Sequence, residues 1–166
     1  ANVTIPDVSG NDFRFREDEG FVLIEPSFFK VFDFKESEFK WISGSPEVSL
    51  KEPFSVVLTK TMAKKYFGDQ DPVGRTIELQ GTSCKVTGLT TDFPNNTDFP
   101  FRVLVSYETL RKLEGEERFN NWGSVSDEHQ TYIMLSETST RGEMEEKIAK
   151  VHAAHTSKEL SDNRHY

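Results

Sequence analysis

The stretch "YFGDQDPVGRTIEL", residues 66–79, carries two glycines around an acidic turn and decides between two kinds of fold. A phosphate-binding loop has the pattern G-x-x-x-x-G-K-[ST] between a strand and a helix. Here five residues separate Gly68 from Gly74, and Arg75 stands where the phosphate-gripping lysine belongs. A helix is predicted before the loop and a strand after it, so no helix N-terminus would face an anion. The stretch therefore predicts a helix stop, an Asp-Pro turn and the start of a strand.

The segments on either side agree with this interpretation. Residues 54–58 predict a short β-branched strand, and Thr59 fits the N-cap of the following helix. One face of that helix is apolar, and Gly68 stands where a left-handed C-terminal cap belongs. The apolar face consists of Met62, Ala63, Tyr66 and Phe67. Residues 75–80 and 84–94 then predict a β-hairpin around a turn at Gly81.

Strands and helices alternate irregularly along the rest of the chain. Apolar runs predict strands at 21–24, 102–105 and 130–136. A single helical turn is expected after Pro26, a helix capped near Ser106, and a surface loop over 114–127. The last helix begins at a capping box formed by Thr140 and Glu143. This order predicts an α+β fold with a mixed or antiparallel sheet.

Length and charge limit the function classes. The 166 residues fit one domain, residues 1–166, or two small lobes that share a core. The net charge of −8 argues against nucleic acid as a partner, because phosphate contacts need a basic face. No run of 18 apolar residues exists, and the start lacks the features of a signal peptide. Cys84 is the single cysteine, which predicts a buried, inert thiol and excludes an internal disulfide.

Residues that could carry chemistry are scattered. Asp92 and Asp98 could form an acid–base pair, but 28 acidic residues make such a coincidence ordinary. His152 and His155 lie three apart on the last helix, and a zinc site would need a third ligand such as Glu159. Asn95 fits a glycosylation acceptor, a pattern that is common by chance. These patterns predict no catalytic residue, no metal site and no cofactor.

Aromatic residues are abundant. The chain has 14 phenylalanines, several of them in "PSFFKVFDF", which favours a core built around a sheet. Phe119 and Trp122 lie in the polar loop over 114–127. They are either anchors beneath the loop or contacts for a partner, and the pattern favours anchors.

The segments "FSVVLTKTMAKKYFGDQDPVGRTIEL" and "KVTGLTTDFPNNTDFPFRVLVSYETL" resemble the extracytoplasmic core domain of MacB/FtsX-type ABC transporter permeases. The resemblance covers roughly residues 20–150. The family pattern is an aromatic-Gly helix end, Asp-Pro-x-Gly, a Val-x-Gly strand and an Asp-x-Pro turn. The positions that match it are Phe67, Gly68, Asp71, Pro72, Gly74, Gly88, Asp92 and Pro94. We call these eight residues the motif residues.

The resemblance implies a domain without catalysis. It would lie on the periplasmic face of the bacterial inner membrane and relay the motion of membrane helices driven by a separate ATPase. Its partners would be the rest of the permease, the ATPase indirectly, a second permease copy and periplasmic or outer-membrane proteins. The motif residues would be structural. A small-molecule or peptide sensor is the alternative, and it requires an apolar pocket lined by phenylalanines.

Two departures from the family pattern matter. The chain is expected to lack the family's opening strand and helix, and the flanking membrane spans. Thr97 and Asp98 stand where the family has Ser-His.

Overall fold

A computed structural model describes residues 1–7, 10–35, 37–94, 96–120 and 129–155. The chain divides into two compact units, residues 1–114 and residues 115–166. Each unit is described by itself. Among the described residues, every strand and four of the six helices lie in the first unit.

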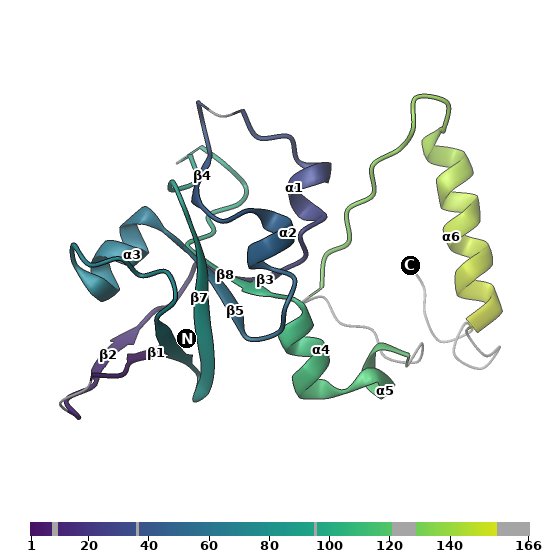
Figure 1. Cartoon of the computed structure of the whole chain (residues 1–166). Coiled ribbons are helices and arrows are strands. Elements are labelled where there is room, and N and C mark those ends of the chain that lie inside the picture. The colour runs from purple at the N-terminus through teal and green to yellow at the C-terminus, as the bar shows by residue number, and fades with distance from the viewer. Residues whose placement is uncertain (8–9, 36, 95, 121–128, 156–166) are drawn as a thin grey trace. The chain divides into compact units, whose positions relative to one another are not determined.

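The first unit is built on an eight-stranded mixed sheet (Figure 1). Its strands are β1 (Asn2–Ile5), β2 (Phe13–Arg16), β3 (Phe21–Ile24), β4 (Trp41–Ser43), β5 (Ser55–Thr59), β6 (Thr76–Leu79), β7 (Thr82–Thr90) and β8 (Val103–Ser106). The strand order is β2-β1-β6-β7-β5-β8-β3, and β4 pairs with β7 outside this path. The pairs β5–β7 and β3–β8 are parallel and the others are antiparallel. The predicted α+β class with a mixed sheet is confirmed.

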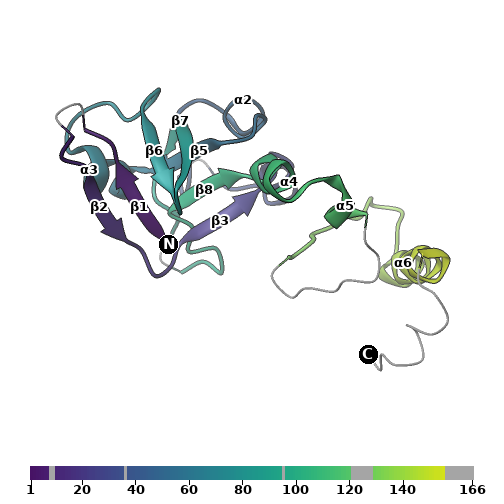
Figure 2. The same cartoon turned by 90° about the horizontal axis from the view of Figure 1, so that it is seen from below.

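Short helices cover the two faces of this sheet. The first unit contains α1 (Phe28–Val31), α2 (Pro46–Ser49), α3 (Lys60–Phe67) and α4 (Glu108–Glu114). Figure 2 shows the same elements from below, with α4 following β8. The helix α3 packs against β5 and β7. The helix face predicted around Tyr66 is buried as expected.

Two hydrophobic clusters form because successive side chains of a strand point to opposite faces. Val56 and Leu58 of β5 belong to the cluster under α3, whereas Val57 belongs to the cluster under α1 and α2. All five residues of β5 are buried. The sheet is therefore packed on both faces.

The predicted hairpin is confirmed as β6 and β7. Gln80 and Gly81 form its turn with φ angles of +53° and +81°, the handedness that suits a two-residue hairpin. Cys84 lies on β7 and is buried, as predicted. Burial raises the pKa of its thiol to about 11.

Three local predictions are wrong. Residues 130–136 form no strand, and Tyr132 to Leu135 stay exposed; an apolar run becomes a strand only beside a partner strand. Ser106 caps no helix, because its hydroxyl donates to the carbonyl of Leu50 and α4 begins at Glu108. The start of the expected loop over 114–127 is helical, as the end of α4 and as α5 (Glu116–Phe119).

The second unit contains α5 and α6 (Arg141–His155). The capping box of α6 is confirmed: the Thr140 backbone N–H donates to Glu143 at 2.8 Å, and the Glu143 N–H donates to Thr140 Oγ1. These bonds hold the pKa of Glu143 below its ordinary value. Ile148 and Val151 are about half exposed on α6. No helix among the described residues is long and apolar enough to cross a bilayer.

Candidate functional site

Residues 68–75, which we call the Gly-Asp-Pro-Gly turn, hold their own backbone together. Gly68 ends α3 with φ +63°, a conformation that favours glycine, and its N–H donates to the Lys64 carbonyl at 2.9 Å. Asp71 Oδ1 accepts from the N–H of Val73 at 3.0 Å. The Gly74 N–H donates to the Val86 carbonyl of β7 at 2.8 Å. The turn thus joins the end of α3 to the sheet.

Arg75 is used inside the same turn. Its Nε donates to the Asp71 carbonyl at 2.9 Å, and its guanidinium lies over the Phe67 ring at 5.5 Å. Pro72, which follows Asp71 in the sequence, is buried. The helix comes before the loop and β6 follows it, so the element order is opposite to that of a phosphate-binding loop.

Asp92 caps α3 from a distant segment. Its Oδ1 accepts from the N–H of Thr61 at 3.2 Å and its Oδ2 from the Thr61 hydroxyl at 2.9 Å. Thr59 is at the N-cap position, as predicted, but its side chain makes no capping bond and its buried Oγ1 has no partner in the described part of the chain. The sequence pattern does not indicate that Asp92 caps α3 in place of the Thr59 side chain, because Asp92 lies 31 residues beyond Thr61.

Gly88 lets α2 approach β7 closely. A Cβ at this position would lie 2.8 Å from Ser49 Oγ and 3.1 Å from the Trp41 ring. The Ser49 hydroxyl donates to the Thr87 carbonyl at 2.8 Å, and the Thr87 hydroxyl donates to the Ser49 carbonyl at 2.7 Å. The register of β5 against β7 shifts at this point, between Val56 and Val57. Ser49 was not singled out from the sequence, because nothing in "SPEVSL" indicates its partner.

The remaining predicted residues are spread over the surface. Asp98 and Asp92 are both exposed, which argues against the acid–base pair, and Pro94 is half-buried. His152 and His155 are exposed on α6, and no group of three metal-ligating side chains occurs among the described residues. Phe119 is half-buried at the end of α5. Trp122, Asn95 and Glu159 lie outside the described residues.

A buried carboxylate joins β2 to α3. Glu17 Oε1 accepts from the Tyr66 hydroxyl at 3.2 Å and lies 2.6 Å from Lys65 Nζ. Burial and the Glu17 charge raise the pKa of Tyr66 above its ordinary value. The Phe15 ring packs on Tyr66 at 5.0 Å. This group therefore joins the end of β2 to α3.

The phenylalanine-rich segments meet on the other face of the sheet. Ring contacts connect Phe28, Phe29, Phe32, Phe34, Phe39, Trp41, Phe93, Phe99 and Phe101. The shortest separation joins Phe39 and Phe93, whose centroids are 4.4 Å apart. These residues come from the segment around α1, from β4 and from residues 93–101. We call this group the aromatic cluster.

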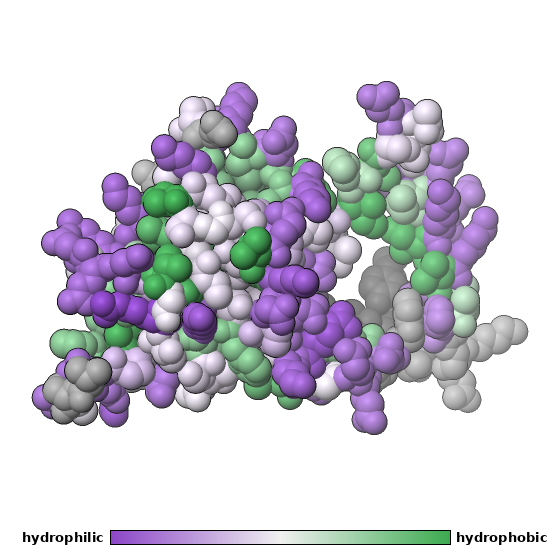
Figure 3. Space-filling model, in the orientation of Figure 1, coloured by the Kyte–Doolittle hydropathy of each residue, from purple (hydrophilic) through white to green (hydrophobic). Residues whose placement is uncertain are grey.

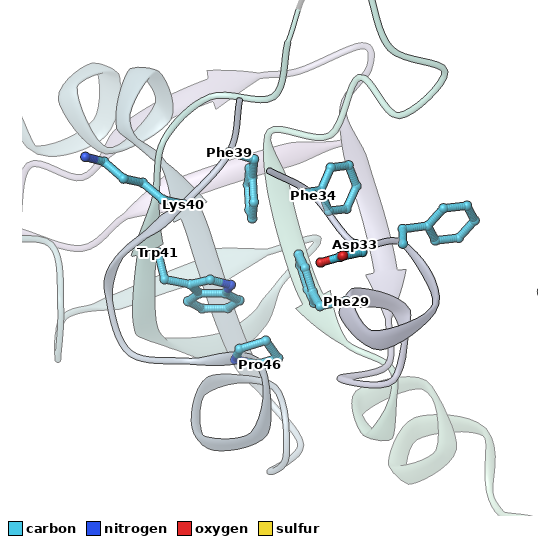
Figure 4. A pocket seen from close by; sticks show the side chains of 8 residues that line it. Phe29, Asp33, Phe34, Phe39, Lys40, Trp41 and Pro46 are labelled. Atoms are coloured by element: carbon cyan, nitrogen blue, oxygen red, sulfur yellow. The ribbon is translucent and has the colours of Figure 1, made fainter. Parts of the chain in front are cut away.

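An open cavity of about 420 Å³ lies at the edge of the aromatic cluster (Figure 4). It is lined by Phe29, Phe32, Asp33, Phe34, Phe39, Lys40, Trp41 and Pro46. The Asp33 carboxylate points between the Phe29 and Phe34 rings, whereas the Lys40 ammonium points away from them. The alternative sensor function requires a pocket lined by phenylalanines, and four phenylalanines line this one. Nothing in the sequence pattern indicates Asp33, Lys40 or Trp41 as further lining residues.

The side of the molecule shown in Figure 3 is mostly polar. Figure 3 shows small apolar areas over β4 and α2, the elements that carry the exposed Ile42 and Val48. Val48 is 73% exposed, which is unusual for an apolar helix residue. Single exposed apolar residues do not by themselves mark an interface.

The sequence model of the MacB-like periplasmic core domain matches residues 3–151. The chain belongs to this family. The match covers the sheet with its motif residues and most of the helix α6. MacB-like periplasmic core domains are parts of ABC transporter permeases, they lie on the periplasmic side of the membrane, and they are generally non-catalytic. No curated protein matches the chain.

Solved structures show the same fold. A crystallised domain from a Porphyromonas gingivalis protein named as a permease is 18% identical with a TM-score of 0.71, and the match covers 96% of this chain and 62% of that one. The periplasmic region of MacB from Actinobacillus actinomycetemcomitans is 17% identical with a TM-score of 0.53, over 92% of this chain and 63% of that one. This MacB-like chain therefore spans less than two thirds of each relative.

Proposed function

We propose that this MacB-like domain is a mechanical relay in an ABC transporter permease. It would carry the motion of the membrane helices, driven by ATP hydrolysis in a cytoplasmic subunit, to a substrate or partner in the periplasm. The observation that carries this proposal is the first unit itself: a sheet packed on both faces whose inner strand β5, between β7 and β8, is buried along its whole length. A relay must be stiffer than the segments that move it.

We further propose that the motif residues give the unit this stiffness. Asp92 fixes the N-terminus of α3, and Gly68 with Asp71 fixes its C-terminal turn. Gly88 allows α2 to lie against β7. The Asp92 and Gly88 contacts join elements that are distant in the chain, whereas the Gly68 and Asp71 contacts are local to the end of α3. Loss of any of them would loosen the unit without removing a ligand.

The expected partners follow from family membership. They are the membrane part of the permease, the ATPase subunit acting through it, and a second permease copy. Periplasmic or outer-membrane proteins are further candidates, and Phe119 and Trp122 are the aromatic side chains we propose for such a contact.

The test is a distance measurement in the full permease, reconstituted with its ATPase. Nitroxide labels at Lys51 and Lys60, both exposed in the first unit, report on the unit's own shape. A single label at Lys60 in each of two copies reports on motion between copies. Cys84→Ala removes the native thiol. Rigid relay predicts a constant Lys51–Lys60 distance and a distance between copies that differs between ADP and ATP.

Two results would contradict the relay. One is a nucleotide-dependent change within the first unit that matches the change between copies, because the unit would then deform. The other is saturable ATP binding by the isolated chain, which would make it a nucleotide protein in its own right. An Asp98→Asn variant with the same labels serves as a matched control. Because Asp98 is exposed, this change should leave both label distances unaltered.

A further inference from the structure

The cavity beside α1 combines aromatic walls with an uncompensated charge. The Asp33 carboxylate forms no hydrogen bond or ion pair with any described residue, although Lys30 nearby in the chain pairs with Glu47 at 3.4 Å. Figure 4 places the carboxylate between the Phe29 and Phe34 rings, on the cavity side. A carboxylate in this position attracts a cation that reaches the rings from the cavity.

The rings add a second attraction for the same charge. Phe29 stacks on Phe39 with centroids 5.7 Å apart, and Trp41 meets Phe29 edge-on at 5.4 Å. Cations within about 6 Å of an aromatic face are stabilised by the ring electrons, most strongly by tryptophan. The positive group already present, the Lys40 ammonium, points away from the rings and leaves this position open.

The volume of the cavity limits the size of the ligand. A cavity of about 420 Å³ is near the small end of the range for small-molecule sites, which runs from about 300 to 1,000 Å³. It accommodates a single ring with a short side chain, but it is too small for a folded peptide. The net charge of −8 favours the approach of a cation over that of an anion.

We propose that this cavity binds an organic cation: an ammonium or guanidinium group carried on an apolar, preferably aromatic, body. Asp33 pairs with the charge, and Phe29, Phe34, Phe39 and Trp41 contact the apolar body. The site does not depend on the relay function, because binding is a property of the isolated chain and motion is a property of the full permease. A negative binding result would therefore not contradict the relay, and a negative distance measurement would not contradict cation binding.

Three probes of matched shape and different charge test the proposal: 2-phenylethylammonium, 2-phenylethanol and 3-phenylpropionate. In a Trp122→Phe background, excitation at 295 nm gives the fluorescence of Trp41 as the single tryptophan. The probes do not absorb at this wavelength. We expect saturable quenching or a spectral shift with the ammonium at a Kd on the order of 1 mM. The alcohol should bind about two- to five-fold more weakly, since Asp33 is exposed and the ion pair is partly screened. The carboxylate should bind weakest.

Variants assign the effect to residues. Asp33→Asn should abolish the preference for the ammonium over the alcohol while the alcohol still binds. Glu38→Gln, an exposed acid nearby that does not line the cavity, should keep the preference, and Lys40→Ala should keep or strengthen it. Circular dichroism and amide NMR spectra establish that each variant is folded. Equal binding of all three probes, an unchanged preference in Asp33→Asn, or no saturation up to about ten times the expected Kd each overturns the proposal.

Discussion

Replacing Gly88 by alanine tests whether α2 and β7 are held at the separation that the structure requires. The added Cβ would lie 2.8 Å from Ser49 Oγ, 3.1 Å from Ser49 Cβ and 3.1 Å from Trp41 Cζ3. All three separations are shorter than ordinary carbon contacts, and Ser49 is fully buried and bonded to Thr87. Overpacking of this kind costs about 1–3 kcal/mol. Glycine in a strand interior is itself unfavourable by roughly 0.5–1 kcal/mol, which alanine recovers. The difference between the two effects is a net expected loss centred on about 1 kcal/mol.

Urea denaturation followed by circular dichroism measures this loss, with Ser83→Ala on the exposed side of β7 as the matched control. The control should change the free energy of unfolding by less than about 0.5 kcal/mol. A double-mutant cycle locates the effect: in a Ser49→Ala background the nearest contact is gone, so Gly88→Ala should cost at least about 0.5 kcal/mol less. If Gly88→Ala is neutral or stabilising, or if its cost is the same in both backgrounds, the close approach is not what glycine provides.

Further predictions concern the cap, the buried carboxylate and the thiol. Asp92→Ala should destabilise the chain by about 1 kcal/mol through loss of the α3 cap, whereas Asp98→Ala should be neutral in the same urea titration. Glu17→Leu should cost about 1–3 kcal/mol because the buried Tyr66 hydroxyl loses its acceptor; Glu17→Gln, which keeps an acceptor, should cost less. The pKa of Cys84 is raised from 9.0 to about 11 in the folded chain, so its contribution to stability is complete below pH 9 and falls as pH rises toward 11. Between pH 8 and 11 the free energy of unfolding should therefore fall less steeply with pH in Cys84→Ala than in the unchanged chain, by up to about 1.4 kcal/mol per pH unit. Equal slopes in the two proteins would show that the Cys84 pKa is not raised.

The parts of the fold that the sequence predicts well are those set by neighbouring residues. The strand expected over 54–58 is observed over 55–59, and the buried face of α3, its stop at Gly68 and the hairpin at Gly81 are all where they were expected. Each depends on a periodic pattern or on a glycine with positive φ, which is local information. The strand β1 was missed because four residues before a proline carry too short a pattern.

The parts that could not be predicted depend on residues far apart in the chain. Thr61 and Asp92 meet across 31 positions, and Ser49 meets Thr87 across 38. The Val-x-Gly pattern indicates that something approaches Gly88 closely, but not what. The aromatic cavity is the same kind of case: the number of phenylalanines is visible in the sequence, whereas the position of the Asp33 carboxylate between Phe29 and Phe34 depends on how the segments around α1 and β4 fold together.

Stability and ligand recognition use different residues in this domain, and that separation can be tested by mutation. Gly68 and Asp92 satisfy backbone needs of the chain itself and do not line the cavity, so substitutions there should change the free energy of unfolding and leave cation preference intact in the folded fraction. Asp33 is exposed and makes no bond within the described part of the chain, so its substitution should change cation preference and leave unfolding free energy nearly unchanged. For the proposed relay this arrangement would be an advantage, because a ligand could bind at the cavity wall without weakening the contacts that hold α3 to the sheet.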